Sequence, residues 1–154
     1  MLYYRVSYGQ NCMNEFIDYL IKYSAGCLLI GFNSENFDNT FIISALLKKN
    51  VKLVSESLMY CNNAILSMHF NVEGGICKVH DLYRFLNSSL DSCCEDYKIE
   101  NKKTEFNHLK MKEWCDVETY KEEVKSYLIM DVMSLHELYI KFNDSNQHYE
   151  LFNN

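Results

Sequence analysis

The sequence contains no proline, no internal repeat and no low-complexity stretch. Prolines and compositionally biased segments often mark linkers between domains, so their absence predicts one domain over residues 1–154. With 48% hydrophobic residues, a chain of 154 residues is also long enough to bury a substantial core. We therefore expect a single globular domain with few local signals for where its elements end.

Long apolar runs and clustered metal ligands are also missing. No apolar run approaches the roughly 20 residues that cross a membrane. The first residues, Met1–Arg5, lack the charged-then-apolar order of a secretory signal. The seven cysteines include no Cys-x-x-Cys pair, and the five histidines are not at close ligand spacing to one another. These absences predict an intracellular protein with reduced cysteines, no membrane segment and no transition-metal site.

Basic residues are too few for a broad basic surface, because the net charge is −6. Proteins that grip duplex DNA through many phosphates carry such a surface, so this mode of binding is not expected. A local nucleic-acid site remains compatible with the charge. In a nuclease, for example, carboxylates hold divalent cations, and the cations meet the phosphate.

Apolar spacing along the chain predicts both helices and strands. Helices are expected at residues 13–25, 37–48, 89–97 and 118–142. Strands are expected at residues 2–8, 27–32, 65–72 and 76–82, with Gly74-Gly75 turning the last two into a hairpin. The strand at 27–32 and the helix at 37–48 are apolar on all sides, which predicts burial between layers. This order indicates an α/β layered domain and resembles the RNase H-like fold.

An acidic residue interrupts the apolar side of the last predicted helix. At 100° per residue, Asp131 falls between Leu128 and Leu135 in an apolar stripe, with Tyr127 one turn earlier. Burial of an unpaired charge is costly, so Asp131 needs a metal, a cation or several hydrogen-bond donors. A structural alternative is that Asp131 pairs with a lysine or caps another segment while Tyr127 only packs.

A polar cluster follows the predicted strand at 27–32. In α/β sheets, ligands usually bind at the carboxyl ends of strands, where Asn33, Phe37 and Asp38 would stand. The Asn33 amide is suited to donate a hydrogen bond to a nucleotide, and the Phe37 ring to stack on a base. Alternatively, Asp38 has a purely structural role, because the dipole of a helix favours an acid in its first turn.

Two segments resemble motifs of the DEDD exonuclease superfamily. Asn33-Ser-Glu-Asn-Phe37-Asp38 looks like the second exonuclease motif, Asn-x(2–3)-Phe/Tyr-Asp. Tyr127-Leu-Ile-Met-Asp131 looks like the third, Tyr-x(3)-Asp. The order of the two segments and their separation of about 90 residues also fit.

Two further segments resemble motifs of protein-primed family B DNA polymerases, as found in phages, viruses, linear plasmids and transposons. Ser89-Leu90-Asp91-Ser92-Cys93 is similar to the Ser/Thr-Leu-x-x-hydrophobic motif. Lys103-Thr104-Glu105-Phe106 is similar to the Lys-x-x-hydrophobic motif. Over roughly residues 11–142, the chain therefore resembles the 3′–5′ proofreading exonuclease domain of such a polymerase, with an RNase H-like, three-layer α/β fold.

The resemblance implies a role for each matching residue. Asp38 and Asp131 would bind Mg²⁺ or Mn²⁺, and Tyr127 would help to orient the attacking water. The residues that would hold the frayed 3′ end of single-stranded DNA are Asn33, Phe37, Phe41, Ser89, Leu90 and Lys103. Lys102 competes with Lys103 for its role. Structural alternatives are a helix cap for Ser89, a solvated loop charge for Lys103 and ordinary core packing for Phe41.

The first exonuclease motif of the family, Asp-x-Glu, has no match in this chain. Glu15 and Asp18 are the only acids before Asn33, and they lie on a predicted helix. The polymerase palm motifs Ser-Leu-Tyr-Pro and Tyr-x-Asp-Thr-Asp are absent too, which excludes nucleotide addition by this chain alone. Two metal ions need more carboxylates than Asp38 and Asp131. We therefore expect an N-terminally truncated exonuclease domain that is inactive alone. Loss of its central strand would leave sheet edges open, which predicts poor solubility or pairing with another chain, such as the remainder of a split polymerase.

Two other functions remain open. One is a non-catalytic module that binds single-stranded DNA or a partner protein on a decayed exonuclease fold. The other is an unrelated α/β interaction protein in which the four motifs occur by coincidence.

Overall fold

The computed structural model describes residues 4–62, 64–101, 106–107 and 111–146, with the backbone alone for residues 114, 115 and 117. The chain divides into two compact units. The first, here called the sheet unit, is Arg5–Asn87. The second, the helical unit, consists of Ser88–Asn154 together with Met1–Tyr4. The single domain expected over residues 1–154 stays a prediction.

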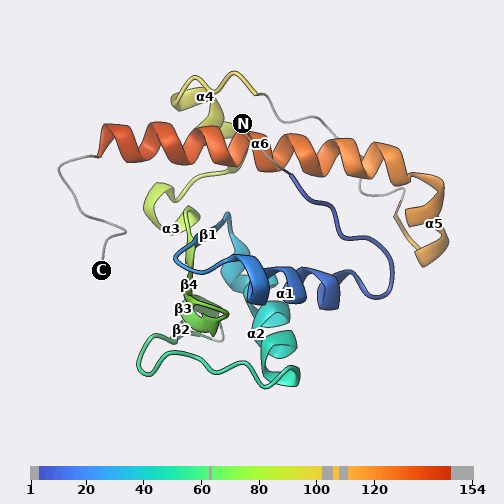
Figure 1. Cartoon of the computed structure of the whole chain (residues 1–154). Helices are drawn as coiled ribbons and strands as arrows, with labels where there is room; N and C mark the ends of the chain where they lie inside the picture. The colour runs from blue at the N-terminus through green and yellow to red at the C-terminus, as the bar shows by residue number, and fades with distance from the viewer. Residues whose placement is uncertain (1–3, 63, 102–105, 108–110, 147–154) are drawn as a thin grey trace. The chain divides into compact units, whose positions relative to one another are not determined.

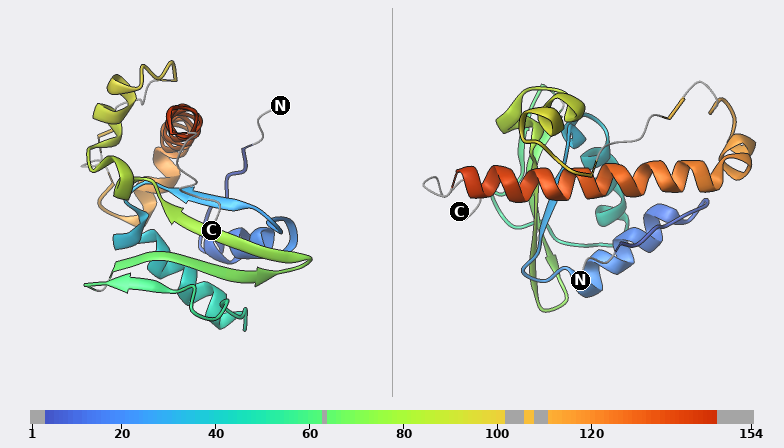
Figure 2. Two further views of the ribbon diagram at one scale, coloured as in Figure 1. Left: turned by 90° about the vertical axis from the view of Figure 1, so that its left-hand side faces the viewer. Right: turned by 90° about the horizontal axis from the view of Figure 1, so that it is seen from above.

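The sheet unit contains four strands and three α-helices among its described residues (Figure 1). In chain order the elements are α1 (Cys12–Tyr23), β1 (Leu28–Gly31), the 3₁₀ turn η1 (Ser34–Asn36), α2 (Asp38–Lys48), β2 (Met59–Cys61), β3 (Ala64–Val72), β4 (Gly75–Asp81) and α3 (Tyr83–Leu86). The strands lie in the order β1-β4-β3-β2, with β1 parallel to β4 and the other neighbours antiparallel (Figure 2). The expected α/β class is therefore confirmed, and the sheet is mixed.

The predicted hairpin is confirmed, with its turn one residue earlier than expected. Val72 pairs with Gly75, so Glu73 and Gly74 form the two-residue connection. Gly74 has φ of 86°, a left-handed conformation that suits a residue without a side chain. This tight turn fixes which residues of β4 face the core.

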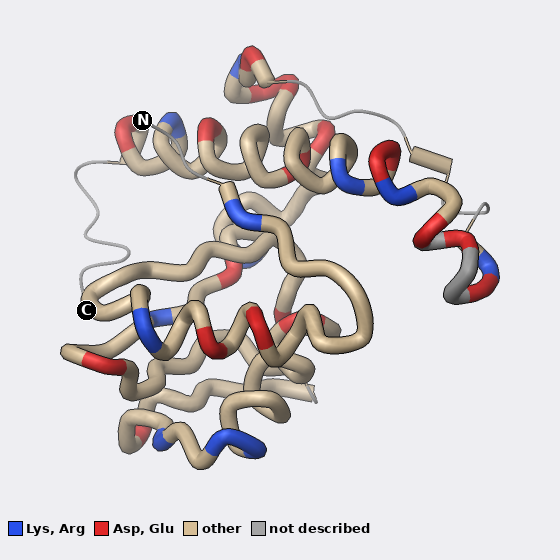
Figure 3. Tube along the Cα trace, turned by 45° about the vertical axis from the view of Figure 1, so that its right-hand side comes forward, with Lys and Arg blue, Asp and Glu red and all other residues tan. Residues whose placement is uncertain are grey.

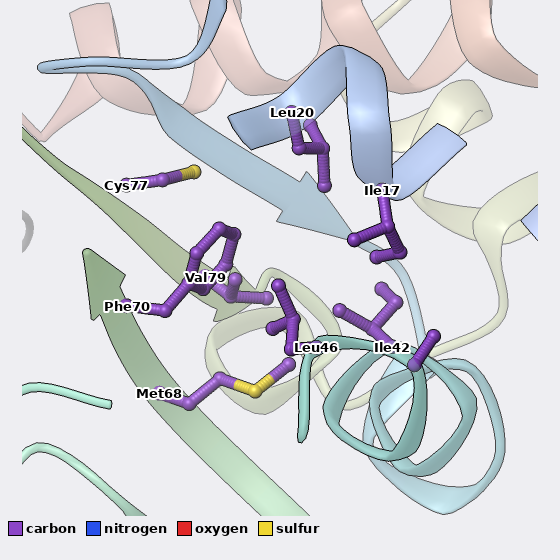
Figure 4. Close-up of a cluster of buried hydrophobic side chains, with 9 residues drawn as sticks. Ile17, Leu20, Ile42, Leu46, Met68, Phe70, Cys77 and Val79 are labelled. Carbon is purple, nitrogen blue, oxygen red and sulfur yellow. The ribbon is translucent and has the colours of Figure 1, made fainter. Parts of the chain in front are cut away.

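The core of the sheet unit lies between one face of the sheet and the helices α1 and α2 (Figure 4). Helical spacing places apolar side chains of α1 and α2 on the sides that face the sheet. Alternating residues of β3 and β4 supply the apolar side chains on the facing side of the sheet. The buried cluster comprises Ile17, Leu20, Ile42, Ala45, Leu46, Met68, Phe70, Cys77 and Val79. It anchors β4 and α2, the two elements that end and begin at the candidate site.

Some expectations for the sheet unit are wrong. Tyr4–Tyr8, the described part of the segment predicted as a strand at 2–8, has no strand structure. The helix α2 is not buried on all sides, because Phe41 and Leu47 are 60% and 56% exposed. Strand β1 is half-buried rather than fully buried, since it lies at one edge of the described sheet. In the last two cases apolar composition was mistaken for burial between two layers, whereas the core covers one side.

The helical unit contains α4 (Leu90–Asp96), α5 (Trp114–Thr119) and α6 (Lys121–Ser145). The helices predicted at 89–97 and 118–142 are thus confirmed, with shifted ends. Acidic and basic residues both occur along α6 (Figure 3). Among the described residues, no helix has the length and apolar character needed to cross a membrane.

The buried side of α6 differs from the predicted apolar stripe. Ser134, Leu138 and Phe142 are its buried residues, whereas Leu128 and Val132 are 48% and 59% exposed. The prediction that the stripe faces the core is therefore confirmed for Phe142, its last residue, and wrong for Leu128 and Val132. Polar contacts to the segment after α4 involve the Ser134 side of the helix, and a hydrophobicity pattern cannot register such contacts.

Candidate functional site

A tight loop joins β1 to α2 and carries the residues of the second motif. Gly31 ends β1, and a Cβ atom at this position would lie 2.2 Å from Ser34 Oγ, so the loop requires glycine there. Asn33 adopts a left-handed conformation with φ of 58°. Asparagine tolerates this region better than most residues do. The chain then makes the 3₁₀ turn η1 and enters α2 at Asp38.

A buried carboxylate organises this loop. Asp81, the last residue of β4, is 2% exposed and accepts four hydrogen bonds. The Asn33 and Tyr83 N–H groups donate to its Oδ1 atom at 2.8 and 3.0 Å. The Glu35 N–H group and the Ser34 hydroxyl donate to its Oδ2 atom at 3.0 and 3.2 Å. One side chain therefore ties both the loop and the start of α3 to the end of β4.

Two further contacts attach the loop to α3. The Glu35 side chain, which is 10% exposed, forms an ion pair with Arg84. The rings of Phe32 and Tyr83 meet edge to face with centroids 5.7 Å apart. The loop after β1 and the helix after β4 thus form one connected polar and aromatic cluster at adjacent strand ends.

Four of the predicted site residues lie on or just after this loop. Asn33, Asp38, Phe37 and Phe41 are all exposed, the two rings by 68% and 60%. Core packing, the structural alternative for Phe41, is therefore wrong. Partial removal from water, followed by the negative charge of Asp81, raises the pKa of Asp38 above its usual value. The second motif is thus an exposed aromatic and acidic surface at the start of α2.

Ser89 and Leu90 begin α4 in the helical unit. The Ser89 hydroxyl accepts a hydrogen bond of 3.1 Å from the Ser92 N–H group, so Ser89 is the N-cap of this helix. This confirms the structural alternative for Ser89, while its exposure leaves the predicted role in DNA binding open. Leu90 is half-buried in the first turn.

The Lys-x-x-hydrophobic segment, here called the fourth motif, meets the third exonuclease motif in the helical unit through its last residue, Phe106. The Phe106 ring lies against the Tyr127 ring of α6, with centroids 5.5 Å apart. Asp131, one turn beyond Tyr127, is half-buried. Lys103 and its competitor Lys102 lie outside the described residues. The hydrophobic end of the fourth motif therefore contacts the tyrosine of the third.

A second carboxylate anchors the segment that precedes Lys102. The Glu137 side chain on α6 accepts hydrogen bonds from the Glu100 N–H group at 2.9 Å and from Asn101, through its N–H at 3.0 Å and its amide at 2.9 Å. Lys141 completes the cluster with an ion pair of 3.0 Å. Removal from water raises the pKa of Glu137, but these donors outweigh it and lower the pKa to about 2.

The predicted site residues are distributed over both units. Asn33, Phe37, Asp38 and Phe41 belong to the sheet unit, whereas Ser89, Leu90, Tyr127 and Asp131 belong to the helical unit. The proximity of Asp38 and Asp131 stays a prediction. Over residues 4–62, 64–101, 106–107 and 111–146, no group of three or more His, Cys, Asp or Glu side chains could hold a metal ion. Mg²⁺ or Mn²⁺ at Asp38 and Asp131 stays a prediction.

Asp81 and Glu137 were missed as site residues by sequence reasoning. Asp81 had a usable signal, because it continues the alternating buried positions Cys77 and Val79 of β4, and an acid at such a position needs donors. Glu137 had only a lysine four residues later, which is common on helix surfaces. Its partners Glu100 and Asn101 are brought close to it by tertiary folding alone.

One protein-family model matches the chain over residues 17–121, and its description is "DNA polymerase type B, organellar and viral". This range covers more than half of the chain, including the Asn33–Asp38 loop, Asp81 and the start of α4. Tyr127 and Asp131 lie beyond it. No curated protein and no solved structure matches the chain.

Proposed function

The chain belongs to the family of type B DNA polymerases of organelles and viruses, and from that premise we propose that it is a proofreading-exonuclease domain of RNase H-like fold that binds the 3′ end of single-stranded DNA. The protein-primed branch of the family is part of this proposal. Membership of the family also means that the alternative of an unrelated α/β interaction protein is wrong.

The observation that carries the proposal is the pair of exposed rings at the start of α2. Phe37 is the N-cap residue directly before α2 and Phe41 lies in the first turn of the helix, so both rings stand at its N-terminal end. Their exposures of 68% and 60% are high for phenylalanine, which is usually buried. Unpaired bases stack on such aromatic faces without strong sequence preference. Two exposed rings beside Asp38 suit a frayed DNA end.

Asn33 supplies a polar group next to these rings. Its side-chain oxygen accepts a hydrogen bond of 2.9 Å from the Asn36 amide. This bond fixes the orientation of the Asn33 carboxamide, whose NH₂ group makes no hydrogen bond to another described residue. That group is therefore suited to donate to a base or a sugar oxygen.

Contact between the fourth and third motifs supports the protein-primed assignment. Phe106 closes the Lys-x-x-hydrophobic segment, and its ring packs on Tyr127 of the Tyr-x(3)-Asp segment. Segments about 20 residues apart in the sequence thus meet through the residues that the motifs specify. The roles that the family resemblance implies stay part of the proposal: Ser89, Leu90 and Lys103 would bind DNA, and Tyr127 and Asp131 would serve catalysis once the set of metal ligands is complete.

Nuclease activity is not proposed for the isolated chain. The family resemblance implies Mg²⁺ or Mn²⁺ at Asp38 and Asp131, but the described residues offer no group of three metal-binding side chains. A two-metal hydrolysis needs a fuller set of carboxylates. We propose that a divalent cation at Asp38 strengthens DNA binding by offsetting the repulsion between this carboxylate and the phosphate.

The test is a binding titration with the full chain. Fluorescence anisotropy of a short 5′-labelled oligo(dT) is followed with magnesium and with EDTA. We expect saturable binding that magnesium strengthens. Phe37→Ala or Phe41→Ala should each weaken binding by roughly 5-fold to 100-fold, the range for loss of one base–aromatic stack.

Tyr60→Ala is the matched control, because Tyr60 is an exposed ring of the sheet unit on β2, 74% exposed and outside the loop. Competition by a linear oligonucleotide but not by a closed circle of the same length would establish recognition of an end. Equal effects of the three alanine variants, or no binding by the wild type in either buffer, would remove the proposal.

A non-catalytic partner-binding module is the second candidate function. It is favoured by β1, an edge strand of the described sheet, at whose ends the Cys27 and Gly31 carbonyls accept from the Lys78 and Leu82 N–H groups. Because backbone groups alternate along a strand, those of Leu28 and Ile30 point away from β4, where an added strand would pair. The partner proposed here is the remainder of a split polymerase. A chain that is monomeric by light scattering and unfolds cooperatively on heating would argue against such pairing.

A further inference from the structure

Asp81 ties the backbone of the loop after β1 by several hydrogen bonds. Four donors converge on its carboxylate: the N–H groups of Asn33, Glu35 and Tyr83 and the hydroxyl of Ser34. A carboxylate offers about four lone-pair positions. These positions are filled, so Asp81 has no acceptor position left for a metal ion or a DNA group.

The bonds to Asp81 hold a backbone shape that is otherwise unfavourable. Asn33 has φ of 58°, in the left-handed region that residues with a side chain rarely occupy. Its N–H group, and that of Glu35 two residues later, turn toward the same carboxylate. Neighbouring N–H groups that converge in this way form an anion-binding concavity, here filled by the protein's own side chain.

Two independent features press the loop onto Asp81. Gly31 lets Ser34 approach so closely that a Cβ atom at position 31 would lie 2.2 Å from its Oγ atom. Glu35 is held from the other side by its ion pair with Arg84. Both features restrict the loop, and Phe37, at the N-cap position of α2, follows directly from it.

We propose that Asp81 is the positioning residue of the DNA-end site: it contacts no DNA itself, but holds the loop so that Asn33 and Phe37 present the amide and the ring together. This inference rests on the proposed function for its ligand. The conformational part, that one buried carboxylate sets the loop, stands independently of any DNA.

The test compares Asp81→Asn with Asp18→Asn, a control that makes the same chemical change at an exposed acid of the sheet unit. Asparagine keeps one acceptor oxygen but turns an NH₂ group toward two of the donors. We expect hydrogen exchange at the Asn33 and Glu35 amides to accelerate by at least about tenfold, the cost of losing a hydrogen bond to a charged group. The Val79 amide in β4 should stay protected, and Asp18→Asn should change none of these rates.

Binding then separates positioning from general stability. In a double-mutant cycle on oligo(dT) affinity, Phe37→Ala should cost less in the Asp81→Asn background than in the wild type, because the ring is already displaced. Additive effects, or unchanged exchange at Asn33 and Glu35, would overturn the inference. If the wild type binds no DNA, the proposed function fails, and the exchange rates still decide the conformational part.

Gly31→Ala keeps the inference testable if Asp81→Asn does not fold. The added methyl group displaces Ser34 from the loop without changing any charge. It should accelerate the same two amides and weaken DNA binding, and normal exchange in this variant would count against the positioning role.

Discussion

Asp81 and Glu137 perform the same task in two regions of the molecule by different physical means. Each carboxylate accepts several hydrogen bonds and fixes a segment beside a predicted DNA-contact motif. Asp81 is 2% exposed, and its donors are uncharged N–H and O–H groups. The Glu137 side chain is 18% exposed, and a lysine is among its partners. A buried acid can thus be satisfied by backbone geometry, whereas one nearer to solvent recruits a cation.

Removal of the Asp81 carboxylate should have the largest effect. Asp81→Ala leaves four donors without an acceptor in a buried site, and we expect the free energy of unfolding to fall by about 3–5 kcal/mol. Urea denaturation monitored by circular dichroism measures the loss. The corresponding change at the other carboxylate, Glu137→Ala, should cost less, and a cost as large as that of Asp81→Ala would break the comparison.

Gly31→Ala should cause the next largest loss in the free energy of unfolding, because it disturbs the Asp81 region by steric crowding alone. The new methyl group would lie 2.6 Å from Ser34 Cβ, and overpacking of this kind costs about 1–3 kcal/mol. Thermal unfolding measures the change. Adding Ser34→Gly removes the crowding, so the double variant should recover part of the loss; no recovery would show that the strain lies elsewhere.

Glu137→Gln should lower the free energy of unfolding at neutral pH by about 1–2 kcal/mol, because amide oxygens accept more weakly than a carboxylate. The folded pKa of about 2 lies below the usual 4.5, so the stabilisation is complete above pH 4.5 and disappears as pH falls toward 2. Urea titrations of wild type and variant over this range should converge at low pH. A constant difference would mean that the carboxylate charge is not the cause.

Lys141→Met should have the smallest effect. The lysine donates to the Lys98 carbonyl at 2.6 Å as well as pairing with Glu137, but its side chain is 37% exposed. Partly exposed ion pairs contribute roughly 0–1 kcal/mol, and salt screens them. The loss measured at low salt should shrink at high salt, whereas the loss in Asp81→Ala should not. Equal salt dependence would remove the distinction between the two regions.

Several features of the fold were predictable because they depend on neighbours in the sequence. Apolar spacing located α1, α2 and α6, and alternation with a glycine-rich turn located the β3–β4 hairpin. Where the predictions are wrong, the cause is non-local. Leu128 and Val132 are as apolar as Leu138, yet only Leu138 is buried, because contacts of the Ser134 side decide which way α6 faces.

The candidate site shows the same division. Its motif residues were visible as a spaced pattern, and the exposure of Phe37 and Phe41 supports the role proposed for them. The carboxylates that shape its loops belong to no such pattern. Asp81 lies 46 residues from Glu35, and Glu137 lies 37 residues from Glu100. Sequence spacing carries no information about pairs that meet through folding.

The sequence by itself determined the α/β class, most of the regular elements and a resemblance to family B DNA polymerases. These are consequences of local periodicity and of residue types at fixed spacings. Only the tertiary structure decided that Phe41 is exposed, that α6 buries its Ser134 side, and that Asp81 and Glu137 hold the loops. Those outcomes depend on which donors and acceptors meet when distant segments pack, because a buried polar group must find its partner wherever the fold provides one.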